Sequence, residues 1–222
     1  MNILAFDTSS PACSVALYSE KNSPDGQIYA MHEVAPMQHT SIILPMMQSI
    51  LDSAGLTLAE LDAIAFGCGP GSFTGIRIAA SLAQGLAYAN DLPVIPVSSL
   101  AATAQAAYMA RGWDRLLTAV DARMGQIYWG AYRIEKNAVT PVFSEELVAP
   151  DAAHAIPEGE WYAVGDAWKI YAGELTSRIG RQPRQIDTEC VPTAEAVLCL
   201  AKDRFQRGDW VDAADALPVY LR

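Results

Sequence analysis

Carboxylate and hydroxyl side chains follow two apolar segments of the chain, and this chemistry suits a metal-bound phosphate. The side chains concerned are Asp7, Thr8, Ser9 and Asp121. Oxygen ligands of this kind are the ones that Mg²⁺ prefers, and Mg²⁺ accompanies nucleotide phosphates. Ala122 and the bulky Arg123 stand beside the second carboxylate, where small or hydroxyl-bearing residues would be needed. The pattern keeps a nucleotide site open, and with it an ATP-binding phosphotransferase or ATPase as one hypothesis.

A glycine-rich loop over 69–75, Gly-Pro-Gly-Ser-Phe-Thr-Gly, lies between an apolar run and a segment of small residues. The backbone N–H groups of such a loop can cradle a phosphate at a helix N-terminus. The spacing matches neither the Walker A loop, which needs a Lys after its last glycine, nor the dinucleotide fingerprint. We therefore interpret the glycines as allowing a sharp strand-to-helix turn and the close approach of a partner helix.

Other catalytic chemistry finds no support in the residue pattern. Ser72 is not the nucleophile of a G-x-S-x-G elbow, because Pro70 and Thr74 stand where the two glycines belong. The three histidines and four cysteines show no metal-ligand spacing. His39 is interpreted as a surface or interface residue near a helix start. We therefore predict no catalytic residue and no metal site.

Each half of the chain repeats one order of elements, in which a strand ending in Asp leads into a polar turn and a second strand. In the first half, further strands are predicted over 27–34, 63–67 and 93–97, with helices over 36–54 and 73–90. The second half has predicted strands over 115–120, 126–134, 139–148 and 161–164 and helices over 168–179 and 193–207. This order, written twice, is that of actin, the heat-shock ATPase chaperones and the sugar kinases, whose halves face each other across a nucleotide cleft.

The predicted fold class is therefore α/β, with duplicated βββαβα halves of the actin-like ATPase (ribonuclease H-like) type. We predict a first unit over 1–103, joined by the C-terminal segment 208–222, and a second unit over 104–207. The second half is degenerate, because it is short and because Trp168 crowds the place where an adenosine-binding turn has a second glycine. A generic α/β domain with coincidental Asp-led turns is the alternative.

The two predicted helices of the first half carry more apolar and small surface than one sheet face can cover. Such surplus is typical of a protein–protein interface. The residues predicted to form it are Met37, Ile43, Met46, Met47, Ile50, Phe73, Ile76, Ala80, Ala83 and Ala87. On this interpretation Ala80→Glu or Ala83→Glu would break association without unfolding the chain. Burial of both helices inside one domain is the alternative.

Charge and hydropathy limit the partners and the location. The formal net charge is −10, so a direct nucleic-acid contact is not expected, because phosphate neutralisation needs a basic face. Apolar runs are too short for the roughly 20 residues of a membrane span. The apolar start of the chain does not have the pattern of a signal peptide. We expect a cytoplasmic protein with reduced cysteines.

The run Gly-Pro-Gly-Ser-Phe-Thr-Gly-Ile-Arg-Ile-Ala over 69–79 closely resembles the signature of the bacterial TsaB (YeaZ) family. Further matches lie at Asp7-Thr8-Ser9, Gln38-His39, Asp121-Ala122-Arg123 and the closing Pro-Val-Tyr-Leu-Arg. The resemblance spans the chain from end to end. It implies a role in forming N6-threonylcarbamoyladenosine beside the anticodon of tRNAs that read ANN codons.

The resemblance also implies partners. These are the larger homologue TsaD, which carries the transferase chemistry, and the ATPase TsaE, with tRNA reached only through them. The two helices of the first half would form the docking face, and a homodimer through that face would compete with TsaD. Where TsaD has an H-x-E-G-H metal motif, this chain has Ser99 and Thr103, which do not replace imidazole on a transition metal. The expected function is a non-catalytic subunit that activates TsaD, with ATP or ADP bound only at a composite interface.

Overall fold

The computed structural model describes all 222 residues and begins with a five-stranded sheet in the order β3-β2-β1-β4-β5. The strands are β1 (Asn2–Asp7), β2 (Ala12–Ser19), β3 (Gln27–Val34), β4 (Ala63–Gly69) and β5 (Val94–Ser98). β1 pairs antiparallel with β2 and parallel with β4. β1, β2 and β4 are buried along nearly their whole length, because helices cover both faces of the sheet. This is why these strands are continuous apolar runs rather than alternating ones.

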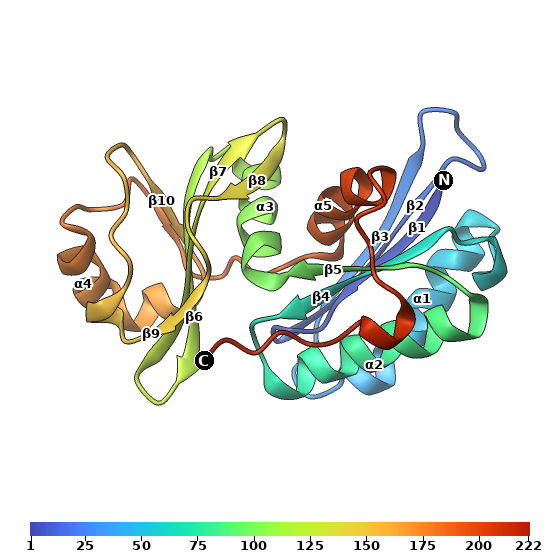
Figure 1. Cartoon of the computed structure of the whole chain (residues 1–222), viewed down its shortest axis with the longest axis horizontal. Coiled ribbons are helices and arrows are strands. Elements are labelled where there is room, and N and C mark those ends of the chain that lie inside the picture. Colours follow the sequence, from blue (N-terminus) through green and yellow to red (C-terminus); the bar gives the residue numbers. More distant parts are fainter.

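Helices α1 (His39–Ala54) and α2 (Phe73–Asn90) cover one face of this sheet, and α5 (Ala194–Gln206) covers the other (Figure 1). The predicted division assigns α5 to the second unit. Its small-residue face, which includes Ala194 and Ala201, instead packs against Ile3 and Ala5 of β1. Small side chains on both surfaces let helix and sheet approach closely. A division by packing therefore places α5 with the first sheet.

The second sheet has the order β11-β10-β6-β7-β8, and β9 pairs with β7. Its strands are β6 (Arg115–Arg123), β7 (Gln126–Glu135), β8 (Ala138–Pro141), β9 (Glu146–Val148), β10 (Tyr162–Val164) and β11 (Ile186–Asp187). Helices α3 (Ser99–Arg111) and α4 (Ala167–Ile179) accompany it, and α3 lies between the two sheets (Figure 1). We call the first sheet with α1, α2 and α5 the first lobe, and the second sheet with α3 and α4 the second lobe.

The strand predicted over 139–148 is two strands, β8 and β9. Pro141 is the last residue of β8, and one more backbone bond to β7 follows it, from Val142 N to Ala131 O at 2.8 Å. In the segment that follows, Glu145 turns toward the first lobe. Its carboxylate accepts hydrogen bonds from Tyr132 at 2.5 Å and from Ser98 at the end of β5. Glu145 therefore connects the two lobes. The two-residue strand β11 was not predicted from the sequence.

A second connection between the lobes runs through Gln105 of α3, which is fully buried. Its side-chain amide accepts from Val139 N at 2.9 Å and donates to Asn137 O at 3.1 Å, so it satisfies the free edge of β8. The same amide nitrogen lies 3.3 Å from Cys199 Sγ on α5. The space between the sheets is thus packed by α3 and α5.

Most helix bounds match the predicted ones, and α2 runs over Phe73–Asn90 as predicted. α1 begins three residues later than predicted, at His39. Met37 has a φ of 63°, which lies in the left-handed region, so a right-handed helix cannot include it. Short 3₁₀ helices occupy three connections: η1 (Leu58–Glu60), η2 (Pro150–Ala152) and η3 (Ala213–Asp215). No helix has the length and apolarity needed to cross a membrane.

The C-terminal segment returns to the first lobe. Val211 forms an antiparallel bridge with Val94 at the start of β5. Ala216 is buried in the core that α2 shares with the sheet. Val219 N then donates to Cys68 O at 2.8 Å, which holds the last residues beside the glycine loop.

Candidate functional site

The glycine loop packs against the chain's own first hairpin, which connects β1 and β2. Thr8 Oγ1 donates to Gly75 O at 2.7 Å, and Ser72 N donates to Ser9 O at 2.8 Å. A Cβ atom on Gly75 would lie 1.9 Å from Thr8 O, and one on Gly71 would lie 2.6 Å from Ser9 O. The predicted sharp turn is confirmed. The backbone that approaches these two glycines belongs to this hairpin, however, and not to a partner helix.

We predict opposite effects from alanine at the two glycines inside α2. Gly75→Ala should lower the free energy of unfolding by roughly 1–3 kcal/mol, because the hairpin backbone must move. Gly85 has open space where its Cβ would be, so Gly85→Ala should raise stability by about 1 kcal/mol. Chemical denaturation of both variants measures the difference. Equal tolerance of alanine at both positions would show that the hairpin contact is not tight.

Asp7 is 1 % exposed, and its carboxylate is engaged by the first hairpin and by the start of α3. Oδ1 accepts from the backbone N and the Oγ of Ser9, both at 2.8 Å, and Ser99 Oγ lies 3.4 Å from Oδ2. Burial raises the pKa of Asp7 to about 6, because the ionised carboxylate loses its hydration; hydrogen bonds from Ser9 and Ser99 and the charge of the nearby His39 act in the opposite sense. Thr8 and Ser9 are buried as well. These three predicted nucleotide ligands thus contact one another or the starts of α2 and α3.

Asp121 is also engaged locally. Its Oδ2 forms an ion pair with Arg123 at 3.0 Å, and its Oδ1 accepts from Arg123 N. Its backbone N donates to Asp166 Oδ1 at 2.9 Å. The Asp121 carboxylate is therefore satisfied within its own hairpin, whereas the Asp7 carboxylate also contacts Ser99 at the start of α3. No three His, Cys, Asp or Glu side chains lie close enough to hold a metal ion.

His39 is a buried residue rather than a surface one. Its Nε2 donates to Ser10 O at 2.9 Å and lies 3.3 Å from Ala12 O. The ring thereby joins the start of α1 to the first hairpin, and it satisfies carbonyl groups that would otherwise be buried without a partner. Its place beside a helix start was predictable, but its long-range partners were not.

Most residues predicted for the partner interface are core residues. Met37 and Phe73 are exposed, and the other eight are buried: Ile43, Met46, Met47, Ile50, Ile76, Ala80, Ala83 and Ala87. Seven of these eight belong to one core cluster with Leu4, Phe6 and Phe66 of the sheet. The prediction is wrong for the eight, because their side chains hold α1 and α2 on the sheet. The sequence pattern did not tell the sheet-facing side of each helix from the outer side.

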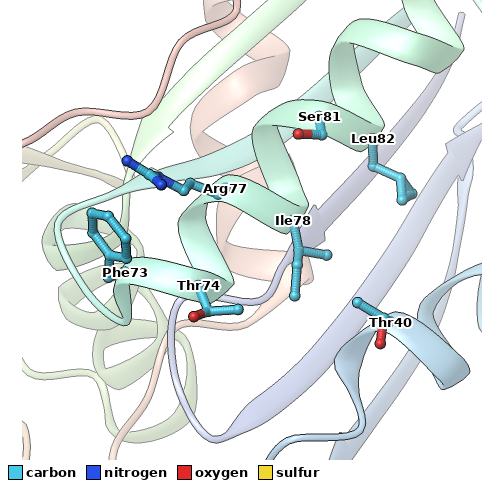
Figure 2. A pocket seen from close by; sticks show the side chains of 7 residues that line it. All are labelled: Thr40, Phe73, Thr74, Arg77, Ile78, Ser81 and Leu82. Atoms are coloured by element: carbon cyan, nitrogen blue, oxygen red, sulfur yellow. The ribbon is translucent and has the colours of Figure 1, made fainter.

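A groove with a volume of about 490 Å³ runs between α1 and α2 on the side turned away from the sheet. It is lined by Thr40, Phe73, Thr74, Arg77, Ile78, Ser81 and Leu82 (Figure 2). Figure 2 shows Ile78 and Leu82 on the side of α2 that faces Thr40 of α1. Leu44, one turn after Thr40 on the same helix face, is 53 % exposed. We call this surface the α1–α2 groove, and no segment of the chain covers it.

Two lobes with Asp-led hairpins, joined through α3 and packed by α5, define an α/β protein of the actin-like type. The family model described as "TsaD: tRNA N6-adenosine threonylcarbamoyltransferase" matches residues 30–179. The chain is 41 % identical to the tRNA threonylcarbamoyladenosine biosynthesis protein TsaB of Escherichia coli K12, over all of this chain and 95 % of that one. The Haemophilus influenzae protein of the same name is 36 % identical, over all of this chain and 94 % of the relative.

Solved structures agree with these relatives. The crystal structure of a Pseudomonas aeruginosa protein "with similarity to peptidase YEAZ" has a TM-score of 0.92 and 42 % identity, with 100 % and 99 % of the two chains covered. A structure described as YeaZ from Pseudomonas aeruginosa has a TM-score of 0.91 and 41 % identity, with 99 % of each chain covered. The chain belongs to the TsaB (YeaZ) family, and it takes part in the biosynthesis of tRNA threonylcarbamoyladenosine.

Proposed function

We propose that the chain is a non-catalytic subunit that docks on a TsaD-like transferase through the α1–α2 groove and activates it. The observation that carries this proposal is the uncovered groove, which Ile78 and Leu82 line, with the exposed Leu44 one turn after Thr40 on α1. Concave apolar surface of this kind is typical of a partner site. The reaction is the formation of N6-threonylcarbamoyladenosine beside the anticodon of tRNAs that read ANN codons.

The internal contacts of the polar residues support a non-catalytic role. Ser9 donates to the Asp7 carboxylate, and Arg123 of the second hairpin donates to the Asp121 carboxylate. Ser99 and Thr103, which stand where TsaD has its metal motif, belong to α3, and Thr103 Oγ1 donates to Ser99 O at 2.8 Å. Chemistry would require these groups to point into a space that a substrate can reach. We therefore assign the transferase chemistry to the partner.

The remaining partners follow from the same proposal. A TsaE-like ATPase joins the pair, and ATP or ADP binds only at an interface composed with the partners. In their absence the same groove is covered by a second copy of this chain. With a net charge of −10 the chain contacts tRNA only through the TsaD-like subunit. The complex acts in the cytoplasm.

Reconstitution of tRNA modification from purified components tests the function directly. Modification should require this chain together with the TsaD-like subunit, and the two should co-elute on gel filtration. Full modification without the chain would overturn the proposal. Isothermal calorimetry with ATP and Mg²⁺ on the chain alone tests the alternative, an ATPase or phosphotransferase that uses Asp7. Micromolar binding with turnover that Asp7→Ala abolishes would favour that alternative.

A further inference from the structure

An arginine and two aromatic rings form a fixed cluster at the edge of the α1–α2 groove. The Arg77 guanidinium carbon lies 3.7 Å from the centroid of the Phe73 ring and 5.8 Å from that of Tyr220. Arg77 Nε donates to the Tyr220 hydroxyl at 2.8 Å. The centroids of the Phe73 and Tyr220 rings are 5.9 Å apart. Figure 2 shows the Arg77 side chain beside Phe73, both on α2.

The C-terminal segment holds the tyrosine of this cluster in place. Val219, the preceding residue, donates its N–H to Cys68 O at 2.8 Å. Gly69 makes room for the segment, because a Cβ atom there would lie only 2.9 Å from Val219 O. Gly69 also has a φ of 106°, which side-chain-bearing residues rarely adopt. Tyr220 is thus anchored by the backbone next to it, although the residue stays 42 % exposed.

Arg77 is the only Lys or Arg in α1 and α2, on a chain with a net charge of −10. It takes part in no ion pair of the chain, and its one hydrogen bond uses Nε. The terminal Nη groups therefore remain free to donate. A guanidinium binds a carboxylate through two parallel N–H bonds, which no neutral side chain reproduces.

We infer that Arg77, oriented by Phe73 and Tyr220, is the residue that receives a carboxylate of the docked partner. This inference rests on the proposed docking of a TsaD-like subunit at the α1–α2 groove. Stacking on Phe73 and the bond to Tyr220 fix a side chain that would otherwise sample many rotamers, so less entropy is lost when the partner binds. Arginine and tyrosine are also enriched among the residues that dominate interface affinity.

Three variants test the role of this cluster by calorimetric titration with the TsaD-like subunit at low and at high salt. Arg77→Gln should weaken docking about 30-fold and flatten its salt dependence, because the charge pair is lost. Arg77→Lys should keep the salt dependence but weaken docking about tenfold, because lysine lacks the planar fork. Tyr220→Phe, which keeps the ring and removes the hydroxyl, should weaken docking about threefold.

A matched control is Arg178→Gln on α4, which removes an exposed arginine from the second lobe. It should leave affinity and salt dependence unchanged. Thermal unfolding should be the same for all four variants and the parent chain. A weaker complex with an unchanged salt dependence in Arg77→Gln would mean that Arg77 acts by packing, and this would overturn the carboxylate contact.

The same titrations separate this inference from the docking proposal itself. If Arg77→Gln binds like the parent chain while Ile78→Glu does not bind, the carboxylate contact is wrong and the docking face stands. If neither variant changes affinity, the α1–α2 groove is not the docking face. If no complex forms with the parent chain, the proposed function fails.

Discussion

Ile78→Glu is expected to abolish docking on the TsaD-like subunit and leave the chain folded. Ile78 lines the groove and does not belong to the core clusters of the first lobe, so a glutamate there stays hydrated in the free chain. In the complex the carboxylate would be buried without a partner, which costs about 3–5 kcal/mol. That cost corresponds to a loss of affinity of more than about 100-fold. Gel filtration of the mixture and the tRNA modification assay measure the loss.

A second groove variant and a matched control make the result specific. Leu44→Glu on the facing helix should also abolish docking. The chain should stay folded, because Leu44 is already exposed. Ile170→Glu places the same charge on α4 of the second lobe, where Ile170 is 58 % exposed, and should leave the complex intact. Loss of docking in Ile170→Glu, or normal docking in both groove variants, would contradict the assignment of the surface.

The substitutions suggested by the sequence alone, Ala80→Glu and Ala83→Glu, should instead unfold the chain. Ala83 is fully buried and Ala80 is 3 % exposed, both against the core of the first lobe. A glutamate there is too large for the site and carries a charge with no partner. Circular dichroism should report the loss of structure, whereas Ile78→Glu should give the parent spectrum.

Asp7→Asn is expected to stabilise the chain by about 3 kcal/mol above pH 6. Burial raises the pKa of Asp7 from its ordinary value of 3.8 to about 6, so the folded state holds a proton that the unfolded state has released. A raised pKa of this size corresponds to about 1.4 kcal/mol per unit. The stability that the protonated carboxyl provides is complete below pH 3.8 and is lost as the pH rises through 6. Asparagine stays neutral, and its oxygen can still accept from Ser9.

Denaturant unfolding as a function of pH tests this prediction. The difference between Asp7→Asn and the parent chain should be largest at neutral pH and should shrink toward pH 4. Asp25→Asn, at an exposed carboxylate in the turn before β3, is the matched control, because it makes the same substitution outside the core. A less stable Asp7→Asn at neutral pH would mean that the ionised carboxylate has a favourable partner in the folded state.

The order of elements was predictable because apolar and polar residues recur at the spacings typical of strands and helices. The apolar strands of the first half and the helix over Phe73–Asn90 lie where the residue types place them. The long apolar run of β1 also indicates that both faces of the first sheet are covered. A strand buried on both faces needs cover on its second face, and α1 and α2 supply only one layer. That signal favours a distant helix such as α5.

The side of α1 and α2 that faces outward was not predictable. α1 carries apolar side chains around much of its circumference. The local sequence therefore does not show that Leu44 lies on the outer side and Met47 on the side that faces the sheet. In α2 the alanines that pack on the sheet would fit a partner helix equally well. Tertiary packing decides such cases, since hydrophobic burial does not depend on direction. For the same reason the contact of Tyr220 with Arg77, 143 residues apart, had no local signature.

The position of α5 in the first lobe has a consequence for synthesis on the ribosome. β1 leaves the exit tunnel first, but the helix that covers Ile3 and Ala5 lies at residues 194–206. Until that segment has been synthesised, one apolar face of the first sheet stays exposed and can aggregate with other nascent chains. The first lobe therefore cannot complete its fold before the rest of the chain is synthesised. A chain truncated before α5 would be an aggregation-prone fragment rather than a smaller folded domain.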